Sequence, residues 1–266
     1  MLKNQIIYKQ LNHVAKLEKT FLNQNENTFI KNNMQPVIDK LQEKIPEKVK
    51  TTLDLTFYKG FQFVFEKGNA YIEKTYDKDS ILLEHDLNNY AVDKYMSKKH
   101  LKNMNKKSNQ SKTLNQSISF LEGGVLGLFG IGLPDIPLFI SVILRTINEI
   151  ALAYGYQYNT NEEKIFIMYI ICGSMTKGET LKEYDEMINL LGKNIDTGNT
   201  IDCNLEDVMK ETSQVLSNSL LLAKVIQGIP VVGVLGGIVN PAIISNVGKY
   251  ANLKYKKRYL LRKIQE

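Results

Sequence analysis

Three ionisable residues are candidates for chemistry, because they interrupt an otherwise apolar part of the chain. Asp135 is the one charged residue among the 22 residues that separate Glu122 from Arg145. It follows a Gly-Leu-Pro turn, so it is either a helix N-cap or a buried carboxylate that faces Arg145 or a polar ligand. Glu149 lies four residues after Arg145, which puts both on one face of a helix. Such a pair forms an ion pair or lines a binding cavity.

No motif in the chain assigns a catalytic reaction. It contains no Gly-x-Ser-x-Gly, no His-Glu-x-x-His and no phosphate-binding P-loop, and its GLFGIG segment lacks the preceding strand of a nucleotide site. The histidines and cysteines are scattered, at His13, His85, His100, Cys172 and Cys203. We therefore expect no catalytic residue, metal or cofactor and favour a non-enzymatic protein. An enzyme with an unrecognised site around Asp135 is the alternative.

Lysine and arginine are concentrated in two stretches that contain no acid, although the net charge of the chain is only +6. Residues 94–112 contain seven lysines, and residues 249–263 contain seven more basic residues. Such clusters form a solvated face, or bind the phosphates of nucleic acid or of anionic lipid. Both border uncharged segments, which favours lipid over nucleic acid. The candidate lipid contacts are Lys98, Lys99, Lys102, Lys106, Lys107, Lys256, Lys257 and Arg258.

Those uncharged segments contain glycines four residues apart, Gly123 with Gly127 and Gly233 with Gly237. This spacing leaves one helix face without side chains, so two helices can pack closely in lipid or in a protein core. Prolines such as Pro137 and Pro230 interrupt both segments, which argues against a simple membrane span. We expect two apolar helical hairpins, either inserted in lipid or buried in protein.

The elements that position these residues are expected to be helices. The chain has six prolines, and residues 1–115 contain only two glycines, too few turn signals for a sandwich or barrel. Apolar residues recur at helical spacing in the first segment, as at Ile7, Val14 and Phe21. Further helices are expected over 51–76, 81–96 and 205–225, with an ordinary amphipathic region from 162 and a polar linker at about 103–117. The predicted fold is an all-α helical bundle.

The chain is divided into an N-terminal amphipathic segment, 1–44, and a helical domain, 45–261. Two isolated cysteines indicate a reducing compartment, and the lysines near the N-terminus exclude a secretory signal there. We therefore expect a cytoplasmic protein at the inner face of the membrane.

Two blocks of sequence resemble the EcsC family: GLPDIPLFISVILRTINEIALAYGY and IPVVGVLGGIVNPAIISNVGKYANLKYKKRYL. The resemblance covers roughly 45–261, and its specific part is 133–156 and 229–258. It implies an all-helical fold and proximity to an ABC transporter, and it transfers no catalytic residue. The matching positions are Pro134, Asp135, Pro137, Arg145, Tyr154, Gly155, Tyr156, Pro230, Gly233, Gly237, Asn240, Tyr255 and Arg258.

Together these features predict a non-enzymatic helical protein that docks on an anionic membrane surface and supports an integral membrane partner such as an ABC transporter. The alternative is a soluble protein that binds a lipid or small molecule in an apolar cavity. Sedimentation with membranes would favour docking, and a co-purifying ligand would favour the cavity.

Overall fold

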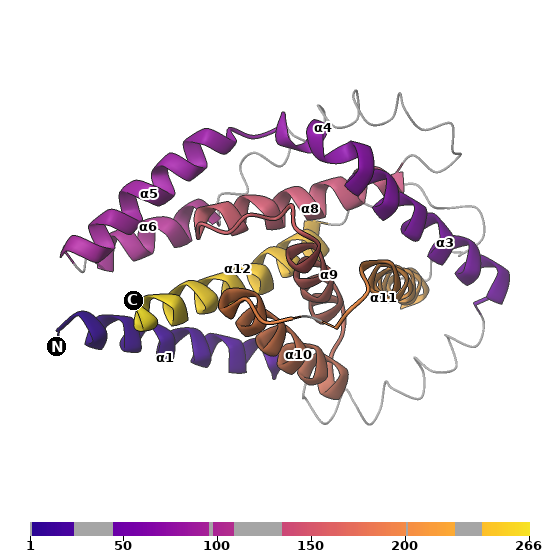
Figure 1. Cartoon of the computed structure of the whole chain (residues 1–266). Helices are drawn as coiled ribbons and strands as arrows, with labels where there is room; N and C mark the ends of the chain where they lie inside the picture. The colour runs from indigo at the N-terminus through magenta and orange to yellow at the C-terminus, as the bar shows by residue number, and fades with distance from the viewer. Residues whose placement is uncertain (1, 24–44, 96–97, 109–134, 201, 227–240) are drawn as a thin grey trace.

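The computed structural model describes residues 2–23, 45–95, 98–108, 135–200, 202–226 and 241–266. These residues form helices and no strand, which confirms the predicted all-α bundle (Figure 1). The two expected hairpins lie mostly outside the described residues. The elements are α1 (Leu2–Leu22), α3 (Glu47–Phe63), the π-helical turn η1 (Val64–Gly68), α4 (Asn69–Glu73), α5 (Lys78–Tyr95), α6 (Lys98–Ser108), α8 (Asp135–Ala153), α9 (Asn161–Met175), α10 (Gly178–Thr197), α11 (Leu205–Ile226) and α12 (Pro241–Gln265).

Helix α9 lies at the centre of the bundle and packs against α10, α11 and α12. Every residue from Ile165 to Ser174 is buried, so this helix has no solvent-facing side over that stretch. The sequence suggested an ordinary amphipathic helix here, and the structure corrects that expectation. A helix that is apolar on all sides is typical of a core surrounded by other helices.

Helix α8 also belongs to the core. The segment 136–153 of this helix is long and apolar enough to cross a membrane, but 89% of the segment is buried inside the protein. A helix buried in the core of a protein can be equally long and equally apolar, so these properties do not identify a membrane span. Packing against α3 is close at Gly60, where an added Cβ would lie 2.6 Å from Ile140 Cδ1. Helix α3 continues through η1 into α4, so the expected helix over 51–76 is one helical segment with a π-helical turn.

Helices α1 and α12 lie side by side (Figure 1). Ile7, Val14 and Phe21 recur every seven residues and are buried. The Phe21 ring stacks on Tyr250 of α12 with 4.7 Å between ring centroids. The described part of segment 1–44 is thus packed on the bundle.

Helices α5 and α6 pack against each other and against α8. Helix α6 extends to Ser108, so the first residues of the expected polar linker at 103–117 are helical, and 109–117 lie outside the described residues.

Candidate functional site

The lysine-rich helix α6 presents the first basic stretch at the surface. Leu101 and Met104 are buried against the bundle, whereas Lys99 and Lys102 are exposed. The helix contains no acidic residue. The side chains of Lys98, Lys106 and Lys107 lie outside the described part of the structure.

A hydrogen bond fixes α6 to α5. His100 Nδ1 lies 2.9 Å from Asn88 Oδ1. An amide oxygen only accepts hydrogen bonds, so Nδ1 carries the proton and donates. This bond and the buried Leu101 and Met104 hold the basic face of α6 in a fixed position on the bundle.

The second basic stretch, on α12, turns inward instead. Arg258 is 5% exposed, and its Nη2 donates to Glu163 Oε1 at 2.7 Å and to Asp196 Oδ1 at 2.6 Å. Its guanidinium also lies over the rings of Tyr156 and Phe166, 4.3 and 4.4 Å from their centroids. Burial alone would lower the pKa of Arg258, but the hydrogen bonds and charges of both carboxylates raise it overall. Arg258 is therefore a permanent internal cation.

A second buried cluster surrounds Lys254, whose ammonium pairs with Glu18 of α1 and Asp185 of α10. Lys257 Nζ donates to the other oxygen of Glu18 at 2.6 Å and to Asn189 Oδ1 at 3.1 Å. Burial lowers the pKa of Lys254, and the two carboxylates offset only part of that shift. The cluster ties three helices together.

These contacts correct the expectation that Lys256, Lys257 and Arg258 contact lipid. Lys256 and Arg258 are buried, and Lys257 is paired with Glu18. Burial also lowers the pKa of Lys256. The physical reason is that α12 is enclosed by neighbours that supply acids, which a count of charges along one segment does not show.

Arg145 and Glu149 form an ion pair on α8, with Nε 2.6 Å from Glu149 Oε1. The Arg145 side chain is 5% exposed and lies over the Tyr76 ring, 5.9 Å from its centroid. Among the described residues, its buried Nη1 has no hydrogen-bond partner, and neither has the buried Oγ of Ser141 one turn earlier. Asp135 is the first residue of α8, and its side chain lies outside the described part. The geometry shows the predicted ion pair between Arg145 and Glu149.

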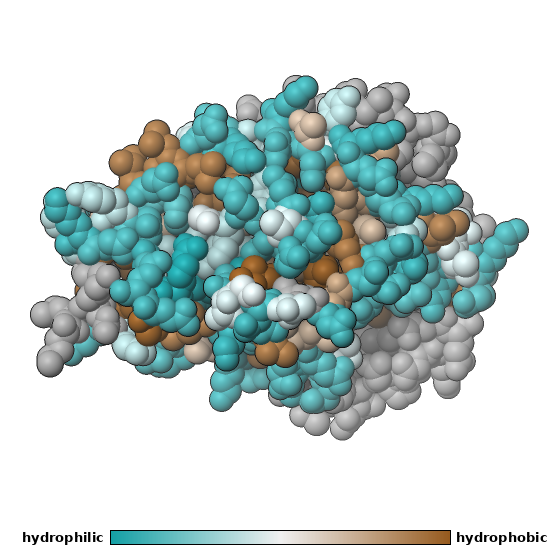
Figure 2. Space-filling model, in the orientation of Figure 1, coloured by the Kyte–Doolittle hydropathy of each residue, from teal (hydrophilic) through white to brown (hydrophobic). Residues whose placement is uncertain are grey.

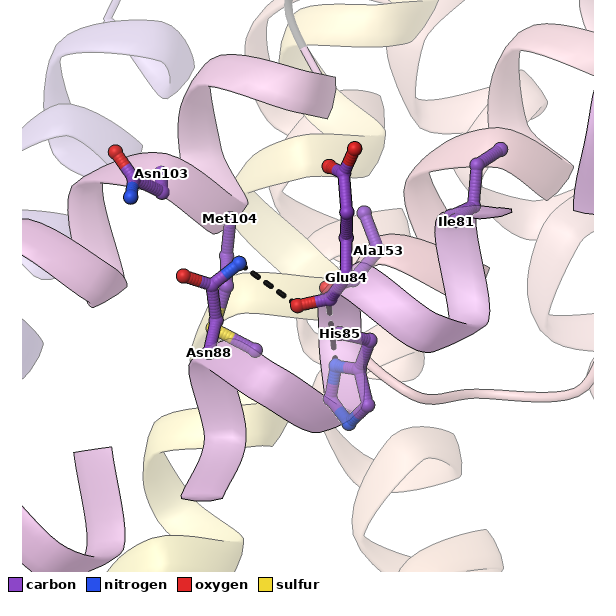
Figure 3. Close-up of a pocket in the computed structure, with 7 residues that line it drawn as sticks. All are labelled: Ile81, Glu84, His85, Asn88, Asn103, Met104 and Ala153. Atoms are coloured by element: carbon purple, nitrogen blue, oxygen red, sulfur yellow. Dashed lines mark hydrogen bonds between the residues drawn. The ribbon is translucent and has the colours of Figure 1, made fainter. Parts of the chain in front are cut away.

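Residues of α5, α6 and α8 line a small, partly open pocket of about 10 Å³ (Figure 3). His85 Nδ1 lies 3.1 Å from the carbonyl oxygen of Ala153, which can only accept, so Nδ1 carries the proton. Burial lowers the pKa of His85. A volume of this size holds about one water molecule. The pocket is lined by Ile81, Glu84, His85, Asn88, Asn103, Met104 and Ala153.

The glycines predicted to mediate close helix packing, Gly123, Gly127, Gly233 and Gly237, lie outside the described residues. Close packing by glycine occurs elsewhere, at Gly192, where an added Cβ would lie 2.9 Å from Arg258 Cδ. Among the described residues, no three His, Cys, Asp or Glu side chains are grouped so that they could hold a metal ion.

Sequence reasoning missed four of the carboxylates that neutralise α12. They come from α1, α9 and α10, 62 to 239 positions from their partners. No local spacing signals such pairs. The one available signal was the large number of acids outside the two basic stretches. The missed carboxylates are Glu18, Glu163, Asp185 and Asp196.

Comparison with known proteins identifies the family to which the chain is related. Residues 8–260 match the model of the EcsC protein family. The chain is also 27% identical over 146 residues to the uncharacterised protein YdbA of Bacillus subtilis (strain 168), an alignment that covers 54% of this chain and 52% of YdbA. The chain thus aligns with about half the length of that relative. No solved structure matches the chain.

Proposed function

The chain belongs to the EcsC protein family, and we propose that it is a helical protein that docks reversibly on anionic membrane lipid through α6. The observation that carries the proposal is the composition and exposure of this helix. It contains five lysines and no acid, and Lys99 and Lys102 are exposed. A lysine near an anionic bilayer contributes about 1 kcal/mol of attraction. The five lysines of α6 are enough for reversible binding.

The contrast with α12 supports the choice of α6. Arg258 and Lys254 pair with buried carboxylates, and the buried Lys263 pairs with Asp93 of α5. Cations that are already neutralised and buried contribute little to a lipid surface. Of the two basic stretches, α6 is therefore the better docking site.

The proposed place of action is the cytoplasmic leaflet, whose anionic lipids attract basic segments. A role in support of an integral membrane partner such as an ABC transporter follows from the family resemblance alone.

Flotation with liposomes tests the docking. Purified full-length chain is mixed with neutral or anionic vesicles at low salt, at high salt and in alkaline carbonate. We expect flotation with anionic vesicles only, lost at high salt, because the screening length between exposed charges falls from about 8 Å at physiological ionic strength to about 3 Å at 1 M. Flotation that resists carbonate would replace peripheral docking with insertion of an apolar hairpin. The absence of flotation under every condition would contradict docking.

A further inference from the structure

Helix α5 carries an apolar stripe on its solvent side. Leu83, Leu87 and Tyr90 are 61%, 62% and 59% exposed and follow one another at spacings of four and three residues. These spacings put them on one face of the helix. Figure 2 shows an apolar patch over α5, at the upper left of the molecule. Ile81, His85 and Val92 face the opposite way and are buried, so the core does not need the stripe.

Cations adjoin the stripe at its C-terminal end. Lys94 Nζ donates to Tyr90 Oη at 2.9 Å and lies 5.7 Å from the ring centroid of Tyr95. Tyr95 is the most exposed of these residues, at 68%. The chain then enters α6 with its exposed Lys99 and Lys102. Tyrosine and lysine side chains of this kind are typical of the headgroup level of a bilayer, because each has an apolar body and a polar end.

Three of the four acids of α5 lie on one edge of the stripe, whereas Glu84 lies on the α6 side, where it lines a pocket with Asn103 and Met104. Asp79, Asp86 and Asp93 are exposed and spaced by seven residues. Asp93 pairs with Lys263 of α12, whereas Asn88 accepts a hydrogen bond from His100 of α6. The edge with three acids therefore faces α12, and the opposite edge, where the half-buried Glu84 is the one acid of α5, is bordered by the lysines of α6. A flat anionic surface is attracted to the α6 side of the stripe and repelled from the α12 side.

We infer that the Leu83–Leu87–Tyr90 stripe of α5 enters the headgroup region of anionic phospholipid while the lysines of α6 bind the phosphates beside it. This inference rests on the proposed docking and adds an apolar contribution to it. Apolar burial combined with lysine attraction is how interfacial helices bind membranes. The cations that adjoin the stripe, Lys94, Lys99 and Lys102, favour anionic lipid as its occupant.

The chain has no tryptophan, so a single introduced tryptophan reports on its site alone. Leu87→Trp places the probe in the stripe, and Leu190→Trp is the matched control, because Leu190 on α10 is 61% exposed. Emission is recorded with vesicles of phosphatidylglycerol and phosphatidylcholine, with and without a quencher on the upper acyl chain. We expect a blue shift and quenching for Leu87→Trp and neither for Leu190→Trp.

Different results separate failure of the inference from failure of the docking. Vesicles that bind the chain without any change in Leu87→Trp emission would overturn the inference and leave docking through α6 intact. Chain that does not bind vesicles at all would contradict both. A blue shift without vesicles that grows with protein concentration would overturn the inference in favour of self-association.

Replacing both leucines supplies a second measurement. Leu83→Asn with Leu87→Asn is expected to weaken vesicle binding about tenfold or more, because about half of each apolar side chain leaves water on insertion. The affinity that remains should still fall with salt. Unchanged affinity in a variant with wild-type circular dichroism would overturn the inference.

Discussion

Lys254 illustrates how much the buried charges depend on one another. Its ammonium is almost fully buried between Glu18 and Asp185. Lys254→Met keeps the volume but leaves the buried Asp185 without its cation, whereas Glu18 retains Lys257. We expect a loss of about 3–5 kcal/mol in the free energy of unfolding, the usual cost of breaking a buried pair from one side. Urea denaturation measures it.

The control for this variant is Lys182→Met, which removes an exposed pair with Glu179. Exposed pairs contribute about 0.2–1 kcal/mol. Similar stability losses in the two variants would mean that the Lys254 cluster does not hold α1, α10 and α12 together.

The buried His85 is expected to make the free energy of unfolding depend on pH. Its pKa is lowered by burial, so the folded state binds fewer protons than the unfolded state below the ordinary histidine pKa. The contribution of neutral His85 to the free energy of unfolding is complete above about pH 6.5. It is lost as pH falls toward the pKa of His85 in the folded state, by at most about 1.4 kcal/mol per pH unit. We expect this part of the slope to be absent in His85→Gln. Urea denaturation at pH 5–8 that gives parallel curves for the two proteins would exclude His85 as the cause.

For individual residues, the sequence predicted only contacts between side chains within about one turn of the same helix. The spacing of four was enough to anticipate the contact of Arg145 with Glu149. The partners of Arg258 and Lys254 depend on tertiary packing between helices far apart in the chain, so composition suggested lipid contacts where the structure has internal ion pairs.

Among the elements, α9 owes its central place to close contact with α12. An added Cβ at Gly173 would lie 2.7 Å from Tyr250 Cε1. That ring cannot move freely, because it stacks on Phe21 and its hydroxyl donates to Asp185 at 2.7 Å. We expect Gly173→Ala to destabilise by about 1–3 kcal/mol through overpacking, against a gain of about 1 kcal/mol in helix propensity. Thermal or urea unfolding measures the net loss.

Gly60→Ala is the matched variant on α3. Its Cβ would clash only with the end of the flexible Ile140 side chain, at 2.6 Å, which can rotate away, and would lie in ordinary contact with Ile136 Cγ2, at 3.6 Å. Its stability should stay closer to wild type than that of Gly173→Ala. The opposite order would show that the α9–α12 contact is looser than the structure indicates.

The helices themselves were largely predictable, because amphipathic spacing and sparse glycine and proline mark them locally. The burial of α9 on all sides was not, since its polar ends, with Glu162 and Glu163, look like those of a surface helix. Central position is a property of the packed bundle and has no local signature.

For the whole molecule, α1 is expected to unfold together with the bundle. Its buried Ile7, Val14 and Phe21, and the pairing of Glu18 with Lys254, join it to α12. Hydrogen exchange should therefore protect the middle of α1 nearly as strongly as α12. Rapid exchange in α1 beside a protected α9 would instead support the predicted separation of segment 1–44 from 45–261.

The central claim is that α6 binds anionic lipid, and the most direct test is the affinity of full-length chain for phosphatidylglycerol vesicles. Lys99→Glu with Lys102→Glu is compared with Lys48→Glu with Lys59→Glu, two exposed lysines of α3 that give the same net charge. At about 1 kcal/mol per lysine, reversal on α6 should weaken binding at least about thirtyfold. Reversal on α3 should change it only a few-fold. Equal losses in the two variants would mean that net charge alone attracts the chain, and would contradict a docking site on α6.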